Sequence, residues 1–225
     1  MGIQLAVFDI AGTTLHDESN VAQVLQHAIK TAGVDVTLDE VNEVMGYAKP
    51  FAIRYLLREK QDARHADDQF IHSLHEIFVE KMKAHYATSP AVREKEGVSA
   101  VFAALKQKGI KIALDTGFSR DITNVILQRT GWQEKGLIDA VATSDEVPHG
   151  RPYPYMIYRL MEQLEIGTIT AVAKIGDTTS DLEEGTNAGC SVVAGVTTGA
   201  YTREELAKGP HTHLISKLDE LLTII

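Results

Sequence analysis

Near its N-terminus the chain reads Leu5-Ala6-Val7-Phe8-Asp9-Ile10-Ala11-Gly12-Thr13-Thr14, in which four apolar residues lead into a polar turn. The apolar part is too short for a helix, so it predicts a buried β-strand over residues 5–8. From about residue 91 onward, short apolar runs alternate with stretches of helical spacing. The further predicted strands cover residues 110–114, 140–143, 171–175 and 191–193. Repeated βα units, closed by a predicted helix over residues 216–225, indicate an α/β fold with a parallel sheet covered by helices on both faces.

Residues 20–87 break this alternation, because their apolar residues keep helical spacing throughout. Within this stretch Thr37 and Glu40 have the spacing of a helix capping box. The helical insert follows the first strand directly, so we expect it to lie as a lid over the carboxyl end of that strand. The predicted division is a core of residues 1–15 and 90–225 and an all-helical cap domain of residues 16–89.

The composition is that of an ordinary globular protein, with 225 residues of which 44% are hydrophobic and 24% are charged. The net charge of -9 opposes binding to nucleic acid or to an anionic membrane surface, since both require a basic protein surface. The single cysteine, Cys190, has no partner for an internal disulfide. Because the chain also shows no basic leader and no apolar run approaching 18 residues, we expect a cytoplasmic protein.

Polar residues gather directly after the predicted strands, where ligands bind in open α/β sheets. Four such segments stand out, at residues 9–14, 115–120, 150–154 and 176–181. Together they contain carboxylates, hydroxyls, glycines and two arginines, which are the groups needed to hold a phosphoryl group and a hard cation. The sequence therefore predicts a catalytic site for phosphoryl chemistry at this edge of the sheet.

The order and content of these segments resemble the haloacid dehalogenase superfamily of hydrolases, whose members carry four motifs on a Rossmann-like core. The resemblance implies a three-layer sandwich with an inserted cap and a reaction through an aspartyl-phosphate at Asp9. Two positions narrow the resemblance to one branch of the superfamily. Ala11 replaces the second carboxylate of the usual Asp-x-Asp motif, and Arg151 replaces the usual lysine of the third motif. Both features are similar to the phosphonatase, or phosphonoacetaldehyde hydrolase, branch and its phosphonatase-like members.

This resemblance implies a role for each polar group, with Mg²⁺ as the cofactor. Asp9 is the nucleophile, and cationic groups spread the charge that develops when it attacks phosphorus. The implied metal ligands are Asp9, the backbone carbonyl of Ala11, Asp177 and Asp181. The implied phosphoryl-binding residues are Gly12, Thr13, Thr116, Gly117, Arg120 and Arg151. Thr116 has a second interpretation, as the cap of a helix over residues 121–129.

Ala11 also removes the acid that would protonate a leaving alkoxide, which handicaps simple ester cleavage. Phosphonatases avoid this need through a cap lysine that forms a Schiff base with the substrate aldehyde. The segment Met45-Gly46-Tyr47-Ala48-Lys49 resembles their Met-Gly-x-x-Lys stretch, which implies that Lys49 is the catalytic imine lysine. To act as a nucleophile, its amine requires a lowered pKa, which burial and the positive charge of Arg120 or Arg151 would provide. The alternative to this catalytic role is that Lys49 is an ordinary exposed lysine of the cap. Where that branch has a histidine shortly after the lysine, this chain has Ile53.

Several functions stay open at this stage. The leading one is hydrolysis of a small phosphonate or related phosphorylated metabolite, and the second is phosphatase action on a small phosphate monoester without imine chemistry. A phospho-receiver module shares the parallel sheet and acidic site but leaves the insert unexplained. A mutase is disfavoured because Ala11 lacks the proton-shuttling group. The resemblance further implies a homodimer formed through the cap helices.

Overall fold

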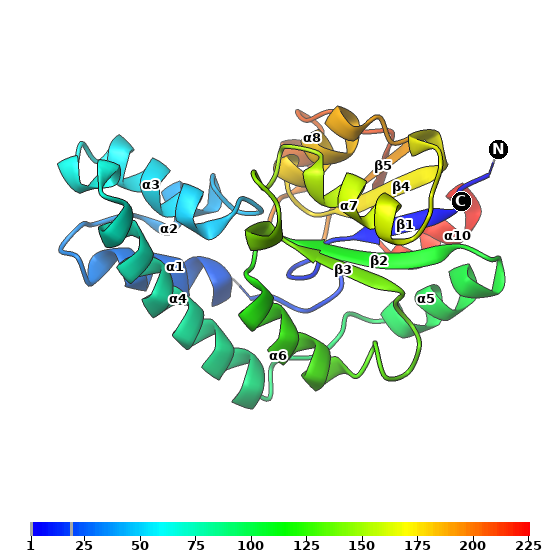
Figure 1. Ribbon diagram of the computed structural model, residues 1–225, viewed down its shortest axis with the longest axis horizontal. Helices are drawn as coiled ribbons and strands as arrows, with labels where there is room; N and C mark the ends of the chain where they lie inside the picture. Colours follow the sequence, from blue (N-terminus) through cyan, green and yellow to red (C-terminus); the bar gives the residue numbers. More distant parts are fainter. Residues whose placement is uncertain (1, 19) are drawn as a thin grey trace.

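The computed structural model describes residues 2–18 and 20–225, with a six-stranded parallel sheet at its centre (Figure 1). The strands are β1 (Leu5–Phe8), β2 (Lys111–Thr116), β3 (Ala140–Thr143), β4 (Val172–Gly176), β5 (Val192–Val196) and β6 (His213–Ile215). Their order is β3-β2-β1-β4-β5-β6, and every neighbouring pair is parallel. The predicted α/β fold is thereby confirmed. Because β1 pairs with both β2 and β4, the residues that follow these three strands come together at one edge.

Helices cover both faces of the sheet, which explains why β1 is apolar at every position. Ala6 and Phe8 pack into one hydrophobic cluster, and Leu5 and Val7 pack into another on the opposite face. Figure 1 shows α7 and α8 on one face and α5 and α6 on the other. The helices of the core are α5 (Val98–Gln107), α6 (Arg120–Thr130), α7 (Tyr155–Gln163), α8 (Thr179–Ala188), α9 (Arg203–Leu206) and α10 (Leu221–Ile224).

The C-terminal segment differs from the prediction of one helix over residues 216–225. Residues 218–224 are helical, as a 3-10 helix at Leu218–Glu220 followed by the short α10, and the edge strand β6 that precedes them was not predicted. The strand is hidden in the sequence because it has three residues and begins with the exposed His213. The fifth strand is also longer than predicted, since it continues through Gly195. A Cβ at Gly195 would press on Leu214 of the neighbouring strand, so a residue that weakens the strand pattern is required for packing.

The insert between β1 and α5 is helical, as its spacing indicates, and we call residues 16–89 the cap. Its helices are α1 (Asn20–Lys30), α2 (Leu38–Asn42), α3 (Lys49–Glu59) and α4 (Asp68–Thr88), with a 3-10 helix at Ala63–Ala66. The capping box of Thr37 and Glu40 is present at α2. Figure 1 shows these helices gathered at one end of the molecule, beyond the strand ends.

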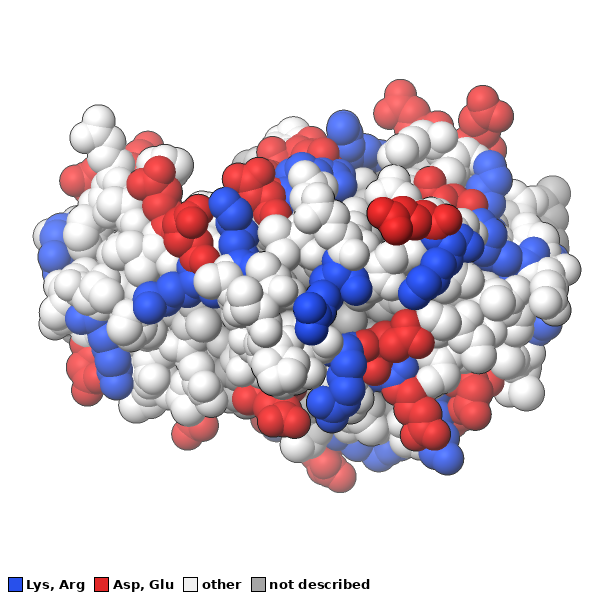
Figure 2. Space-filling model, turned by 90° about the horizontal axis from the view of Figure 1, so that it is seen from below, with Lys and Arg blue, Asp and Glu red and all other residues white. Residues whose placement is uncertain are grey.

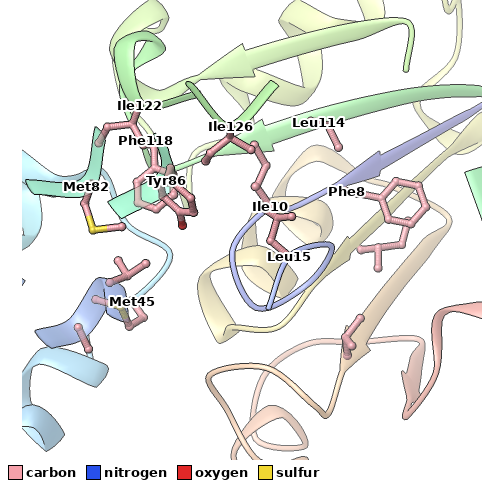
Figure 3. Packing of buried hydrophobic residues seen from close by; sticks show 14 of the residues in the cluster. Phe8, Ile10, Leu15, Met45, Met82, Tyr86, Leu114, Phe118, Ile122 and Ile126 are labelled. Atoms are coloured by element: carbon pink, nitrogen blue, oxygen red, sulfur yellow. The ribbon is translucent and has the colours of Figure 1, made fainter. Parts of the chain in front are cut away.

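One continuous hydrophobic cluster joins the cap to the sheet. Figure 3 shows Met82 and Tyr86 of α4 beside Phe118, with Ile10 and Leu15 between them and β1. The ring centroids of Tyr86 and Phe118 lie 5.8 Å apart in an edge-on arrangement. The cap is therefore packed against the loops that follow β1 and β2.

Charged side chains of both signs are mixed on the surface drawn in Figure 2, where basic groups do not form one extended patch. The mixture of signs on this face accompanies a net charge of -9 for the whole chain. Within residues 2–18 and 20–225, no helix combines the length and apolarity needed to cross a membrane.

Candidate active site

A cavity of about 40 Å³ lies where the ends of β1, β2 and β4 meet the cap. Asp9 follows β1, Thr116 ends β2 and Asp177 follows β4, and all three side chains are at least 95% buried. The site residues inferred from sequence that line this cavity are Asp9, Ala11, Lys49, Thr116, Gly117, Arg151, Asp177 and Asp181. The topology of the sheet thus gathers residues that are up to 172 positions apart (Asp9 and Asp181) in the sequence.

Arg151 is the cation at the centre of the site. Its fully buried guanidinium donates from Nη1 to Asp9 Oδ1 at 2.8 Å, from Nε to Glu184 Oε2 at 3.0 Å and from Nη2 to the Asp115 carbonyl at 2.9 Å. Asp115 Oδ1 is a further acceptor of Nη2. A planar group fixed on three sides cannot rotate away, so one edge stays directed at Asp9.

Arg120 lies elsewhere. Its Nε and Nη2 atoms donate to the carboxylate of Glu146, and Nη2 also donates to the Val141 carbonyl at 2.9 Å. The side chain does not line the cavity. The inferred phosphoryl-binding role of Arg120 therefore lacks support, because a carboxylate 26 residues further along the chain holds its guanidinium.

Gly12 and Thr13 act on the site through Asp177. Thr13 Oγ1 donates to Asp177 Oδ1 at 2.9 Å, and the backbone N–H of Ala200 donates to Oδ2 at 2.6 Å. Gly12 has φ +87°, and a Cβ there would overlap the Asp177 carboxylate. The two residues inferred as phosphoryl-binding thus hold a carboxylate in place, and neither lines the cavity.

Thr116 contributes its hydroxyl at the cavity wall, where Oγ1 accepts a hydrogen bond of 3.2 Å from the backbone N–H of Phe118. The N-cap of α6 is Ser119, so the alternative of Thr116 as a helix cap is wrong. Gly117 allows the cap to approach, because a Cβ there would meet the Tyr47 carbonyl at 2.6 Å.

The buried charges of this region are unbalanced. Its carboxylates are Asp9, Asp115, Asp177, Asp181 and Glu184, and the cations that contact them are Arg151 and Lys174. Burial raises the pKa of Asp9 to about 6, against the opposing attraction of Arg151. Burial, with repulsion from Asp9 and Asp181, raises the pKa of Asp177 to about 8. The excess of negative charge favours a further cation beside these groups.

The oxygen atoms present fit a hard divalent cation. Asp9, Asp115 and Asp181 each offer an oxygen within 4.8 Å of the others, and Asp181 Oδ1 lies 3.0 Å from Arg151 Nη1 and 3.1 Å from Lys174 Nζ. This group shares Asp9 and Asp181 with the inferred ligand set but contains Asp115 where that set has Asp177. We favour Asp177 as a ligand because it lines the cavity together with Asp9 and Asp181, whereas Asp115 is not among the described residues that line it. The buried aspartates are compatible with metal binding.

Lys49 is the first residue of α3 and is 3% exposed, so the alternative of an exposed lysine is wrong. Its Nζ donates to the Tyr47 carbonyl at 3.1 Å and lies 5.7 and 6.0 Å from the ring centroids of Phe118 and Phe78. Burial lowers the pKa of this amine to about 8, with a contribution from Arg151 and against the attraction of Asp9. An amine in this environment is a nucleophile near neutral pH.

The cap loop before Lys49 touches the core through Gly46. This residue has φ +83°, and a Cβ would overlap the hydroxyls of Ser180 and Thr178. Ile53 is fully buried in the hydrophobic cluster, and Arg54 donates to the His65 carbonyl and to Asp68. No histidine is among the described residues that line the cavity.

Sequence reasoning missed four polar residues of this region. Asp115, Lys174 and Glu184 form the buried ion-pair network around Arg151, and Asp17 lines the cavity from the cap side. Two signals were present. Lys174 is a charged residue inside an apolar strand, and Glu184 follows Asp181 by three positions on α8, which puts both on one face of the helix.

Comparisons with known proteins agree with this architecture. The family model described as haloacid dehalogenase-like hydrolase matches residues 6–195. A phosphonoacetaldehyde hydrolase of Bacillus cereus (strain G9842) is 32% identical over 235 residues, which cover 97% of this chain and 86% of that protein. One from Bacillus mycoides (strain KBAB4) is 33% identical with the same coverage.

Solved structures share the fold. A phosphonoacetaldehyde hydrolase-like protein from Oleispira antarctica superposes with a TM-score of 0.86 at 23% identity, covering 100% of this chain and 91% of its own. A predicted phosphoglycolate phosphatase from Haemophilus somnus 129PT has a TM-score of 0.77 at 19% identity, covering 99% and 97%. The family match and the two curated relatives establish to which family the chain belongs. This chain is an enzyme of the haloacid dehalogenase-like hydrolase family.

Proposed function

We propose that this hydrolase cleaves the carbon–phosphorus bond of phosphonoacetaldehyde or a closely related small phosphonate. Asp9 is the proposed nucleophile, and Lys49 is the proposed imine-forming lysine. The observation that carries the proposal is the buried Lys49, with a pKa of about 8, in the same 40 Å³ cavity as Asp9. The name that the Bacillus relatives bear supports the same substrate class.

The phosphoryl side of the site belongs to the core. Arg151, 2.8 Å from Asp9 Oδ1, offsets negative charge as the carboxylate oxygen attacks phosphorus. Thr116 and Gly117 line the same cavity, and the Thr116 hydroxyl and the Gly117 backbone N–H are the proposed donors to the remaining phosphoryl oxygens. Asp9, the Ala11 carbonyl, Asp177 and Asp181 would hold Mg²⁺, which supplies charge neutralisation when bound.

The carbon side belongs to the cap. The neutral amine of Lys49 adds to the substrate aldehyde, and loss of water gives a protonated imine. When Asp9 forms its bond to phosphorus, the electron pair of the carbon–phosphorus bond moves toward the imine nitrogen and leaves an enamine. Protonation of the enamine and hydrolysis release acetaldehyde, and water releases phosphate from Asp9. Because the leaving group is an enamine carbon, cleavage itself needs no acid at position 11, where the chain has Ala11.

The contacts between the cap loop and the core set a condition on substrate entry. Met45, Gly46 and Lys49 line the cavity from the cap, opposite residues of the core, so substrate entry requires the cap loop to move away from the core. The contacts that must separate are those of Gly46 with Thr178 and Ser180 and of Tyr47 with Gly117. Closing them again excludes water from the imine.

The second candidate is a phosphatase acting on a small phosphate monoester, favoured by the buried Ile53 and by the absence of histidine from the described cavity wall. The test is Mg²⁺-dependent phosphate release from phosphonoacetaldehyde and from small phosphate esters, with and without borohydride. We expect release from the phosphonate, loss of activity on borohydride treatment with substrate, and inactive Lys49→Arg and Asp9→Asn variants. Lys81→Ala, which changes an exposed cap lysine, is the matched control. Release from esters alone, unaffected by Lys49→Arg, would establish the phosphatase and exclude imine chemistry.

We also propose that the cap helices join two copies of the chain, as the family resemblance implies. Phe51 of α3 is 53% exposed and stacks with Tyr55, which leaves apolar surface on the cap. Sedimentation of the wild type and of Phe51→Glu should give a dimer and a monomer; a monomeric wild type at micromolar concentration contradicts the proposal.

A further inference from the structure

The cavity contains a carboxylate that none of the four motifs supplies. Asp17 lies in the segment between β1 and α1 and lines the cavity together with Lys49 and Asp9. Side chains that line one small cavity border the molecule that is bound in it. Asp17 therefore borders the space that the proposed nucleophile and the proposed imine lysine share.

The position of Asp17 is fixed through one of its two oxygens. Oδ1 accepts hydrogen bonds from the first backbone N–H groups of α1, at 2.7 Å from Asn20 and 3.4 Å from Val21. Within residues 2–18 and 20–225, Oδ2 has no hydrogen-bond partner. One oxygen thus anchors the side chain to the helix, while the other makes no hydrogen bond to any residue that the structure describes.

The other groups that could transfer a proton in this cavity are committed. Asp9 is the nucleophile, Thr13 and the Ala200 N–H hold Asp177, and Asp181 lies 3.0 Å from Arg151. Among the described residues lining the cavity, only Asp17 is left to exchange protons with Lys49 and the leaving group.

We propose that Asp17 is the proton-transfer residue of this site and provides the acid that Ala11 lacks, an inference that rests on the hydrolase function proposed above. The carboxylate takes a proton from the Lys49 ammonium, which leaves a neutral amine and a neutral acid. The amine adds to the aldehyde carbon and forms a carbinolamine. Asp17 then returns its proton to the carbinolamine hydroxyl, which departs as water and leaves the protonated imine and the Asp17 carboxylate. With an ester substrate, the neutral acid donates to the leaving alkoxide.

The test uses Asp17→Asn, because the asparagine amide oxygen still caps α1 while the side chain can no longer exchange a proton. Substrates of similar size separate the roles: phosphonoacetaldehyde, ethyl phosphate, whose alkoxide needs a proton, and acetyl phosphate, whose acetate does not. We expect kcat to fall about 100- to 10,000-fold with the first two substrates and less than about threefold with acetyl phosphate. Glu18→Gln, which changes the adjacent exposed carboxylate, should match the wild type throughout.

A second variant, Asp17→Ala, distinguishes the loss of proton transfer from a folding defect. Asp17→Ala should be inactive with ethyl phosphate, and added formate should restore turnover in proportion to its concentration. Equal losses on all three substrates, or wild-type rates with Asp17→Asn, would overturn the assignment of Asp17. If the wild type hydrolyses esters but not phosphonoacetaldehyde, the proposed phosphonatase function fails, whereas the comparison of ethyl with acetyl phosphate still decides the role of Asp17.

Discussion

Lys49→Met should make the protein more stable at neutral pH while abolishing imine chemistry. The Lys49 amine is 3% exposed, has one hydrogen-bond acceptor and sits at the N-terminal end of α3, where the helix dipole disfavours a cation. Burial lowers its pKa from 10.5 to about 8. That difference corresponds to a destabilisation of about 3 kcal/mol for the charged lysine in the folded state. Methionine has a similar length and no charge to desolvate.

The stability difference between Lys49→Met and the wild type should depend on pH. The unfolded chain binds more protons than the folded protein between pH 8 and 10.5, so the penalty is complete below pH 8 and disappears as the pH rises through 10.5. We expect Lys49→Met to gain about 1 to 3 kcal/mol at pH 7 and little at pH 10.5. The assay is urea unfolding followed by circular dichroism in metal-free buffer, with Lys81→Met as the exposed control. A variant less stable than wild type at pH 7, or a gain that does not change with pH, would refute the reasoning.

Three further perturbations follow from the same contacts. Arg151→Met leaves Asp9 buried without its cationic partner and Asp115 with Lys174 alone, and it should cost about 3 to 5 kcal/mol in urea unfolding; an unchanged midpoint would contradict the ion-pair network. Gly46→Ala should reduce kcat/KM through blocked closure of the cap while the core stays folded, because its Cβ overlaps Thr178 and Ser180; normal kinetics would exclude closure at this contact. Mg²⁺ at about 100 times its Kd should add about 2.7 kcal/mol of stability, measured by thermal unfolding, and a chelator should remove it.

Much of the sheet was predictable because its strands are buried on both faces. Residues 5–8 and 140–143 were predicted with the bounds that the structure has, since a short apolar run next to a polar turn has few other solutions. β6 could not be predicted in the same way. It is held by pairing with β5 and by the packing of Leu214, and neither contact leaves a periodic signal in three residues.

The candidate site was predictable as far as strand topology determines it. Asp9, Thr116 and Asp177 come together because they follow adjacent strands. Strand topology does not determine where the side chains of Arg120 and Arg151 lie. Both follow strands in the sequence, yet Glu146 holds Arg120 away from the cavity while Glu184 and Asp115 hold Arg151 inside it. That choice depends on tertiary contacts across 26 to 36 residues, which spacing alone does not reveal.

The most direct test of the proposed mechanism is the mass of the Lys49 peptide after the enzyme is mixed with phosphonoacetaldehyde and borohydride. If carbon–phosphorus cleavage occurs on the lysine, reduction of the resulting imine leaves an ethyl group on Nζ of Lys49 and nowhere else. Asp9→Asn should instead give a phosphonoethyl group, because the imine forms and the bond to phosphorus remains. An unmodified Lys49 in an enzyme that is releasing phosphate from this substrate would contradict the account.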